Sequence, residues 1–120
     1  MFYMEGGDIY ITRGDTAVFR VEASFIFPTG YDEEERPIVI TPTLSVKKNL
    51  SDTDYVMQVP HKGEVSTPVK SFPIVLRAED TDVEPGSYYY DVQLVYEADG
   101  EKHVYTIGPY RFIVLNDVTR

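Results

Sequence analysis

Residues 76–96 read L-R-A-E-D-T-D-V-E-P-G-S-Y-Y-Y-D-V-Q-L-V-Y, and this segment decides the fold. It begins with the end of one predicted strand, turns through a polar corner and continues as a second, longer strand. In the longer strand, Tyr88, Tyr90 and every second residue up to Tyr96 fall on one side, which is the two-residue period of a half-buried β-strand. The segment therefore predicts a chain that turns a corner and returns into a β-sheet core.

The corner also predicts a buried tyrosine. In a tyrosine corner, a tyrosine early in a late strand inserts its ring into a β-sandwich, and its hydroxyl donates to a backbone carbonyl a few residues upstream. Pro85 and Gly86 form the turn before the strand, so Tyr88 or Tyr90 is placed for this role. An ordinary buried strand tyrosine is an equal alternative for either residue. Asp80 is expected to cap the preceding turn.

Alternating hydrophobic residues recur along the rest of the chain. Strands are predicted within residues 8–12, 16–27, 38–48, 55–59, 71–77, 87–97, 102–107 and 110–115. Pro42 is expected to split the 38–48 segment, because proline cannot donate a hydrogen bond to a neighbouring strand. Asp99 and Gly100 are typical of a type I′ hairpin turn. Gly108 and Pro109 predict a bulge or bend in the last strand.

Length and pattern together predict the fold class. A chain of 120 residues is normally one domain and is long enough to bury a core. No segment has a helical period over ten or more residues, whereas short strands alternate with turn signals. We therefore expect residues 1–120 to form a single all-β domain, an immunoglobulin-like antiparallel β-sandwich of about seven strands.

The composition limits the classes of partner. The chain has 20 Asp and Glu against 11 Lys and Arg, a net charge of −9, and no cysteine. An acidic surface repels the phosphates of nucleic acids and anionic membranes, so neither is expected as a partner. The lack of cysteine excludes disulfides and thiolate metal sites. No apolar run approaches the roughly 20 residues of a membrane-spanning helix.

Groups that could support catalysis or metal binding are sparse. The histidines, His61 and His103, have no cysteine or nucleophilic serine motif beside them, so we do not expect an enzyme or a catalytic residue. The consecutive carboxylates from Asp32 to Glu35 could attract calcium, but they lack the alternating spacing with which a loop wraps an ion. A solvated surface loop is the favoured interpretation of this run, and no metal or cofactor is expected.

Five segments spread over nearly the whole chain carry a resemblance to known proteins. They are I-T-R-G-D-T at 11–16, V-K-K-N-L-S-D at 46–52, L-x-x-E-D-T at 76–81, P-G-S-Y-Y-Y-D-V-Q-L at 85–94 and T-I-G-P-Y-R-F-I-V-L-N-D-V-T at 106–119. Together they resemble the N-terminal domain of phage baseplate upper proteins and related small prophage proteins of Gram-positive bacteria. The resemblance implies an immunoglobulin-like β-sandwich within a virion or tail-associated assembly, and it implies no catalytic residues.

A docking role follows from this resemblance. We expect a non-enzymatic structural or adaptor domain of a phage or prophage tail or baseplate, located in the virion and assembled in the cytoplasm of a bacterial host. Its expected partners are other tail and baseplate proteins, such as receptor-binding or fibre proteins, and self-association into a homo-oligomer stays open. The candidate contact residues are exposed aromatic side chains, namely Tyr3, Tyr31, Tyr55, Tyr89 and Tyr105.

A carbohydrate-binding module that recognises a host cell-surface glycan is the alternative. Sandwiches that bind sugars stack them on exposed aromatic rings, and this chain has 10 tyrosines but no tryptophan. Tyrosine also fills strands because of its β propensity, which is the simpler explanation for its abundance. We therefore prefer the docking role.

Overall fold

The computed structural model describes residues 1–24, 30–61, 64–65 and 71–116, and these residues form strands, turns and loops without a helix. The strands, in chain order, are β1 (Phe2–Glu5), β2 (Asp8–Thr12), β3 (Ala17–Glu22), β4 (Val39–Lys47), β5 (Met57–Pro60), β6 (Glu64–Val65), β7 (Ser71–Leu76), β8 (Gly86–Ala98) and β9 (Glu101–Leu115). The predicted all-β class is confirmed. In this part of the chain, no helix is long and apolar enough to cross a membrane.

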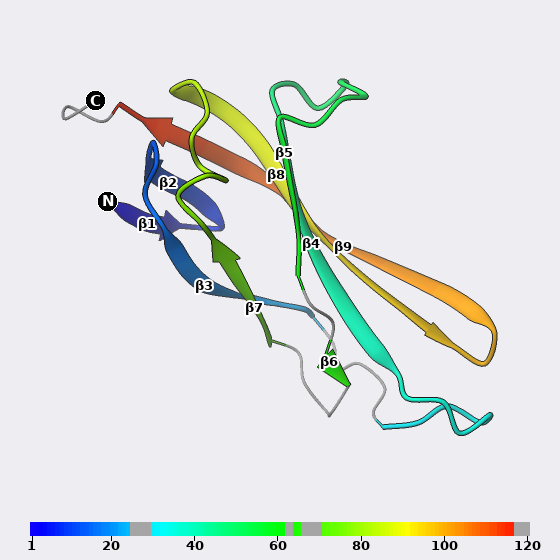
Figure 1. The fold of residues 1–120 in the computed structure, drawn as a ribbon. Coiled ribbons are helices and arrows are strands. Elements are labelled where there is room, and N and C mark those ends of the chain that lie inside the picture. The colour runs from blue at the N-terminus through cyan, green and yellow to red at the C-terminus, as the bar shows by residue number, and fades with distance from the viewer. Residues whose placement is uncertain (25–29, 62–63, 66–70, 117–120) are drawn as a thin grey trace.

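The strands form two sheets that make a sandwich-like arrangement (Figure 1). The larger sheet has the order β1-β2-β9-β8-β4-β5, with β6 also pairing β4, and the smaller sheet consists of β3 and β7. Strands β2 and β9 run parallel and the other pairs are antiparallel. A parallel pair is possible here because no hairpin joins these two strands. The hairpin partner β1 and the two-residue β6 raise the strand number above the expected seven.

The hydrophobic core lies between the sheets and confirms the alternation that the sequence predicts. Residues 88, 90, 92, 94 and 96 of β8 are all buried, as are residues 72, 74 and 76 of β7. Each large aliphatic side chain contributes about 1.5–3 kcal/mol on burial, so a core of this size stabilises the domain without disulfides. The fully buried apolar side chains are Ile9, Ile11, Ile40, Leu44, Val46, Ile74, Leu76, Val92, Leu94 and Phe112. Phe25, within the strand predicted at residues 16–27, lies outside the described residues.

Tyr88 makes the contact of a tyrosine corner. Its hydroxyl donates to the carbonyl of Glu84, four residues upstream, which satisfies the hydroxyl where the ring is buried. Pro85 and Gly86 separate the two residues, and Gly86 is the first residue of β8. Asp80 caps the turn before the corner, because its carboxylate accepts a hydrogen bond of 2.9 Å from the amide of Arg77. Local hydrogen bonds therefore hold the chain as it enters β8.

Tyr90 has a different role from Tyr88. Its buried hydroxyl donates to the carbonyl of Gly7 in the turn between β1 and β2, and burial raises the pKa of this tyrosine. Gly7 has a φ of 92°, and a Cβ there would lie 2.6 Å from the ring of Tyr110. Only glycine fits such a turn. The contact connects the N-terminal hairpin to the centre of the larger sheet.

The expectation that Pro42 splits its segment is wrong, since β4 runs through it without interruption. The Pro42 carbonyl accepts a hydrogen bond of 2.8 Å from the amide of His61, so the nitrogen of Pro42 faces the same edge of β4. On that edge, the β6 pairing ends at Ile40 and the β5 pairing begins at Thr43. The missing N–H therefore falls in the gap between two partner strands.

The β8–β9 hairpin confirms both irregularities that the sequence predicts. Asp99 and Gly100 have φ values of 54° and 78°, as a type I′ turn requires. The register shifts between Tyr90 and Val92, where Gly108 and Pro109 form a bulge in β9 and share a cis peptide bond. The hairpin extends well beyond β3 and β7 and gives the molecule an elongated shape of 53 × 27 × 25 Å (Figure 1).

Candidate docking face

The candidate site is the outer face of the larger sheet, which points away from β3 and β7. Residues that are paired in register lie on the same face of a sheet. The alternation that buries one side of β2, β4, β8 and β9 therefore presents a second set of side chains to solvent. Two neighbouring rows cross this outer face, namely Tyr3, Tyr10, Ile113 and Ser87, and then Arg111, Tyr89 and Lys47.

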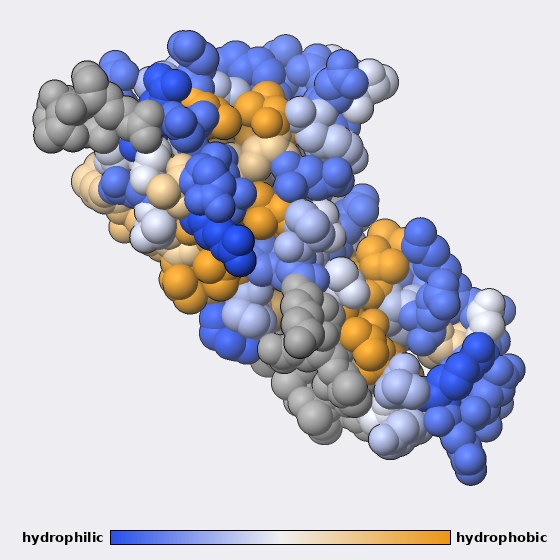
Figure 2. Space-filling view, viewed as in Figure 1, coloured by the Kyte–Doolittle hydropathy of each residue, from blue (hydrophilic) through white to orange (hydrophobic). Residues whose placement is uncertain are grey.

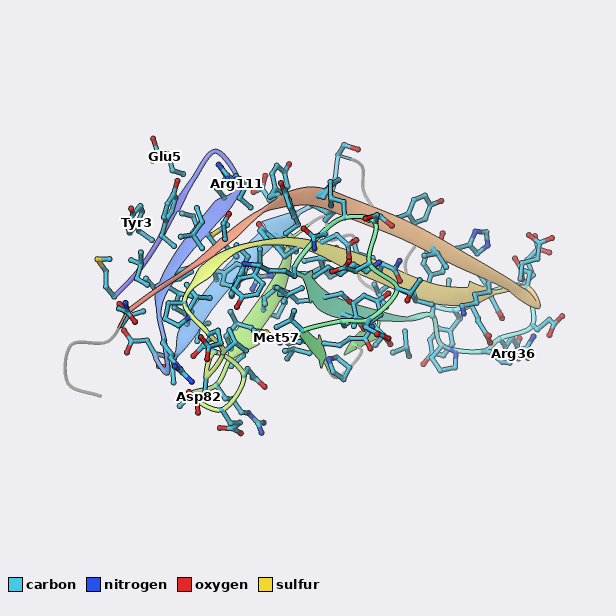
Figure 3. All side chains as sticks on the ribbon, turned by 90° about the horizontal axis from the view of Figure 1, so that it is seen from above. Tyr3, Glu5, Arg36, Met57, Asp82 and Arg111 are labelled. Atoms are coloured by element: carbon cyan, nitrogen blue, oxygen red, sulfur yellow. The ribbon has the colours of Figure 1, made fainter. Side chains whose placement is uncertain are left out.

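The first row contains a pair of stacked aromatic rings. Tyr3 on β1 lies directly opposite Tyr10 on β2, and their ring centroids are 4.6 Å apart at an interplanar angle of 6°. Tyr3 keeps 44% of its surface exposed. Figure 3 shows Tyr3, Glu5 and Arg111 together at the β1–β2 end of the sheet. Stacking limits the rotamers of both rings, so this aromatic surface is ordered before any partner arrives.

Arg111, in the second row, is held in place by two hydrogen bonds. Its backbone amide donates to the carboxylate of Asp8 at 2.9 Å, and its guanidinium donates to the hydroxyl of Ser87 at 3.2 Å. The side chain is nevertheless exposed. Much of its donor capacity remains available, because a guanidinium has five N–H groups.

A small pocket lies beside Tyr89 and has a volume of about 100 Å³. The ammonium of Lys47 stands 5.0 Å from the centroid of the Tyr55 ring, which is a cation–π distance. Asp91 is half-buried in the pocket, and burial raises the pKa of its carboxyl while the charge of Lys47 partly opposes this. The lining comprises Ser45, Lys47, Leu50, Tyr55, Tyr89, Tyr90, Asp91 and Pro109. We call this site the Asp91 pocket.

The five candidate tyrosines do not form one surface. Tyr3, Tyr55 and Tyr89 lie on the outer face or at its edge. Tyr105 instead pairs with Leu94, a core residue, so it lies on the inner side of the β8–β9 hairpin. Tyr31 is 69% exposed in the loop before β4. The structure thus brings together three of the five predicted contact residues.

Tyr105 belongs to an aromatic cluster in the hairpin. Its ring is 6.3 Å from that of Tyr96, and the Tyr96 ring stacks on His103 at 4.7 Å. Burial raises the pKa of Tyr96, and a hydrogen bond with Tyr105 raises it further. This contact makes a structural role the better interpretation of Tyr105.

The acidic loop has a structural explanation. The carboxylate of Asp32 accepts hydrogen bonds from the amides of Glu34, Arg36 and Asp99 at 2.9, 2.9 and 3.1 Å. Chiefly the bond from Arg36 lowers the pKa of Asp32. In return, the Asp99 carboxylate accepts from the amide of Glu33 at 2.8 Å, so the loop and the hairpin tip hold each other. The tip is hydrophilic in Figure 2.

A metal centre has no support in the described parts of the chain, where no three His, Asp or Glu residues are grouped to hold an ion. A larger pocket of about 420 Å³ lies between β5 and β7. There, the ring of His61 accepts a hydrogen bond of 2.8 Å from the amide of Val75 and connects the two sheets. The described residues of this lining include no serine, threonine or cysteine, so none of them offers His61 a nucleophile to activate.

Sequence reasoning missed Arg111 and the Asp91 pocket. The alternation of β8 does place Asp91 beside Tyr89 on the outer face, so this part of the signal is in the sequence. The other walls come from the segment between β4 and β5 and from the bulge in β9. Only the register between strands brings these segments together.

No family model matches the chain, and no curated protein sequence matches it. The resemblance to phage baseplate proteins therefore stays a prediction. The outer face of the larger sheet and the Asp91 pocket are the features that indicate a function.

Proposed function

We propose that this chain is a non-enzymatic docking domain of a phage or prophage tail or baseplate, which binds other virion subunits through the outer face of its larger sheet. The resemblance of its five segments to phage baseplate upper proteins motivates the phage context. One structural observation carries the docking role, namely the ordered strip of tyrosine and arginine side chains from Tyr3 to Tyr89. Tyrosine and arginine are enriched among the residues that contribute most to protein–protein binding.

The strip suits docking because its groups lose little freedom on binding. Tyr3 and Tyr10 are stacked, and Arg111 is positioned by Asp8 and Ser87. Immobilising a flexible side chain at an interface costs about 0.5–1.5 kcal/mol, so side chains that are ordered beforehand avoid part of this cost.

The charge of the chain indicates the kind of surface it meets. A net charge of −9 favours a partner with a basic patch, because complementary potentials speed the encounter and oppose wrong partners. Arg111 and Lys47 stand within the strip, so the partner patch is expected to carry some acidic groups beside its basic ones.

Particle fractionation tests the proposal. After induction of the lysogen that carries this gene, we expect the protein in purified virions or in tail assembly intermediates. Replacement of Tyr3 and Tyr89 by alanine should release it from these particles, whereas Tyr31→Ala, which changes an exposed tyrosine away from the strip, should not. Absence of the unaltered protein from both virions and intermediates would overturn the docking role.

The carbohydrate-binding alternative has one observation in its favour. The Asp91 pocket combines two tyrosine rings with a carboxylate, a combination that could also receive a sugar. Its volume of about 100 Å³ is, however, well below the roughly 300–1,000 Å³ of most small-molecule sites. Specific, saturable binding of the domain to host wall polysaccharide on a glycan array would favour the alternative over docking.

A further inference from the structure

The Asp91 pocket is built by four separate segments of the chain. Strand β4 contributes Lys47 in register with Tyr89 of β8, and Ser45 in register with Asp91. The segment between β4 and β5 adds Tyr55 and Leu50, and the bulge of β9 adds Pro109. Two tyrosine side chains therefore flank a carboxylate that stands on a rigid strand.

Asp91 lacks the partners that a half-buried carboxylate normally has. Within the described ranges, its carboxylate makes no hydrogen bond and no ion pair, and the Ser45 hydroxyl accepts instead from the Gln58 amide at 3.2 Å. Burial raises the pKa of Asp91, which agrees with an incompletely compensated charge. A partly buried charge is unfavourable unless it is paired, so this group is poised to receive a donor.

The size of the pocket and the net charge of the chain select the donor. About 100 Å³ admits the head group of one side chain rather than a whole sugar or a drug-sized ligand. A net charge of −9 favours a cation. A guanidinium is planar, stacks on tyrosine faces and pairs with a carboxylate through two parallel hydrogen bonds, which a lysine ammonium cannot do.

Among the described residues that line the pocket, Lys47 is the one cation. Its ammonium lies over the Tyr55 ring rather than in an ion pair with Asp91. This position indicates that the ring face attracts cations and leaves the carboxylate to a second donor. A pocket that bound an anion would depend on Lys47, whereas a pocket that binds a cation should not.

We propose that the Asp91 pocket binds an arginine side chain of the docking partner, with the guanidinium paired to Asp91 and stacked against the flanking tyrosine rings. The inference rests on the proposed docking function and names the chemistry by which the partner is recognised. Arg111 and the Tyr3–Tyr10 stack would then contact the surface around this arginine.

An NMR titration of the full chain tests the inference directly. The probe is acetyl-Gly-Arg-Gly-amide, and the control is the same peptide with citrulline, which keeps the shape of arginine but lacks its charge. We expect saturable shifts of the Leu50, Tyr55 and Asp91 amides with a dissociation constant on the order of 1 mM. The citrulline peptide should bind about tenfold more weakly. Equal shifts with both peptides would overturn the inference.

Matched variants identify the group that binds. Asp91→Asn should weaken binding of the arginine peptide about tenfold, while Glu101→Gln, which removes the same charge at the hairpin tip, should leave it unchanged. Lys47→Met should retain or strengthen binding. Unchanged affinity in Asp91→Asn, or loss of binding in Lys47→Met, would contradict an arginine site. Saturable shifts with methyl glucoside in place of the peptide would contradict it in favour of a sugar.

The two proposals fail in different experiments. If the protein is present in particles but the arginine peptide does not bind, the pocket inference is wrong and the docking role stands. If the peptide binds but the protein is absent from particles and intermediates, the docking role is wrong and the pocket serves another basic partner.

Discussion

The two faces of the larger sheet are built from the same strands but differ in how their polar groups are satisfied. On the inner side, the hydroxyls of Tyr88 and Tyr90 both donate to backbone carbonyls. On the outer side, the carboxylate of the next residue, Asp91, has no hydrogen-bond or ion-pair partner among the residues that the structure describes. The inner face therefore contributes to stability, whereas the outer face is the surface on which the proposed docking role depends.

The largest expected effect comes from the inner face. Phe112 is fully buried, and replacing it by alanine should lower the free energy of unfolding by about 3–5 kcal/mol, through lost burial and the cavity left behind. Ile113→Ala, one residue along and on the outer face, should lower it by only about 1 kcal/mol. Urea denaturation measures both values, and similar losses would mean that the two faces are not distinct.

The tyrosines of β8 give a smaller but sharper contrast. Tyr88→Phe removes the hydrogen bond to Glu84 and should lower the free energy of unfolding by about 1 kcal/mol. Tyr89→Phe removes a hydroxyl on the outer face and should change stability by less than about 0.5 kcal/mol. Equal effects in chemical denaturation would argue against the tyrosine corner as a stabilising contact.

The hydrogen bonds of Asp32, which join the acidic loop to the hairpin tip, should be lost in acid. Because hydrogen bonds lower the pKa of Asp32 in the folded state, its contribution to stability is present above the ordinary aspartate pKa of 3.8 and is lost as the pH falls through the lowered value. Asp32→Asn should therefore accelerate amide exchange of Arg36 and Asp99 at neutral pH, with little change in the core. Unchanged exchange at both amides would show that Asp32 does not hold the acidic loop against the hairpin tip.

The smallest expected change in stability comes from Asp91. Its pKa is raised in the folded state, so the ionised carboxylate lowers stability, and this penalty develops as the pH rises through the raised pKa. Asp91→Asn should therefore leave the free energy of unfolding at pH 7 unchanged or increase it, as thermal melts would show. A clear loss of stability would mean that Asp91 has a structural partner and is not held free for binding.

Local patterns were sufficient to predict most of the fold. Alternation predicted the buried face of β8, and the Asp99-Gly100 pair predicted the hairpin turn. The prediction for Pro42 was wrong because β4 can contain a proline at the gap between β5 and β6, and this gap is visible only in the sheet. The parallel pairing of β2 with β9 likewise depends on segments at opposite ends of the chain.

The candidate site was less predictable than the fold. Tyr3, Tyr55 and Tyr89 were identified as exposed aromatics, but sequence alone does not separate them from Tyr105, which lies on the inner side of the hairpin. The signal for Asp91 is equally indirect, because its significance depends on burial by groups from β4 and β9. Periodicity predicts which way a side chain points, whereas a site depends on what stands next to it.

The most direct test of the docking face is competition for assembly. In cells that produce equal amounts of two tagged copies, one unaltered and one carrying Tyr3→Ala and Tyr89→Ala, mass spectrometry of purified particles gives their ratio. Docking through the outer face predicts that particles contain the unaltered copy at least about tenfold more often, because two interface residues of this kind together contribute more than about 1.4 kcal/mol. Equal incorporation of the two copies would contradict docking through the outer face.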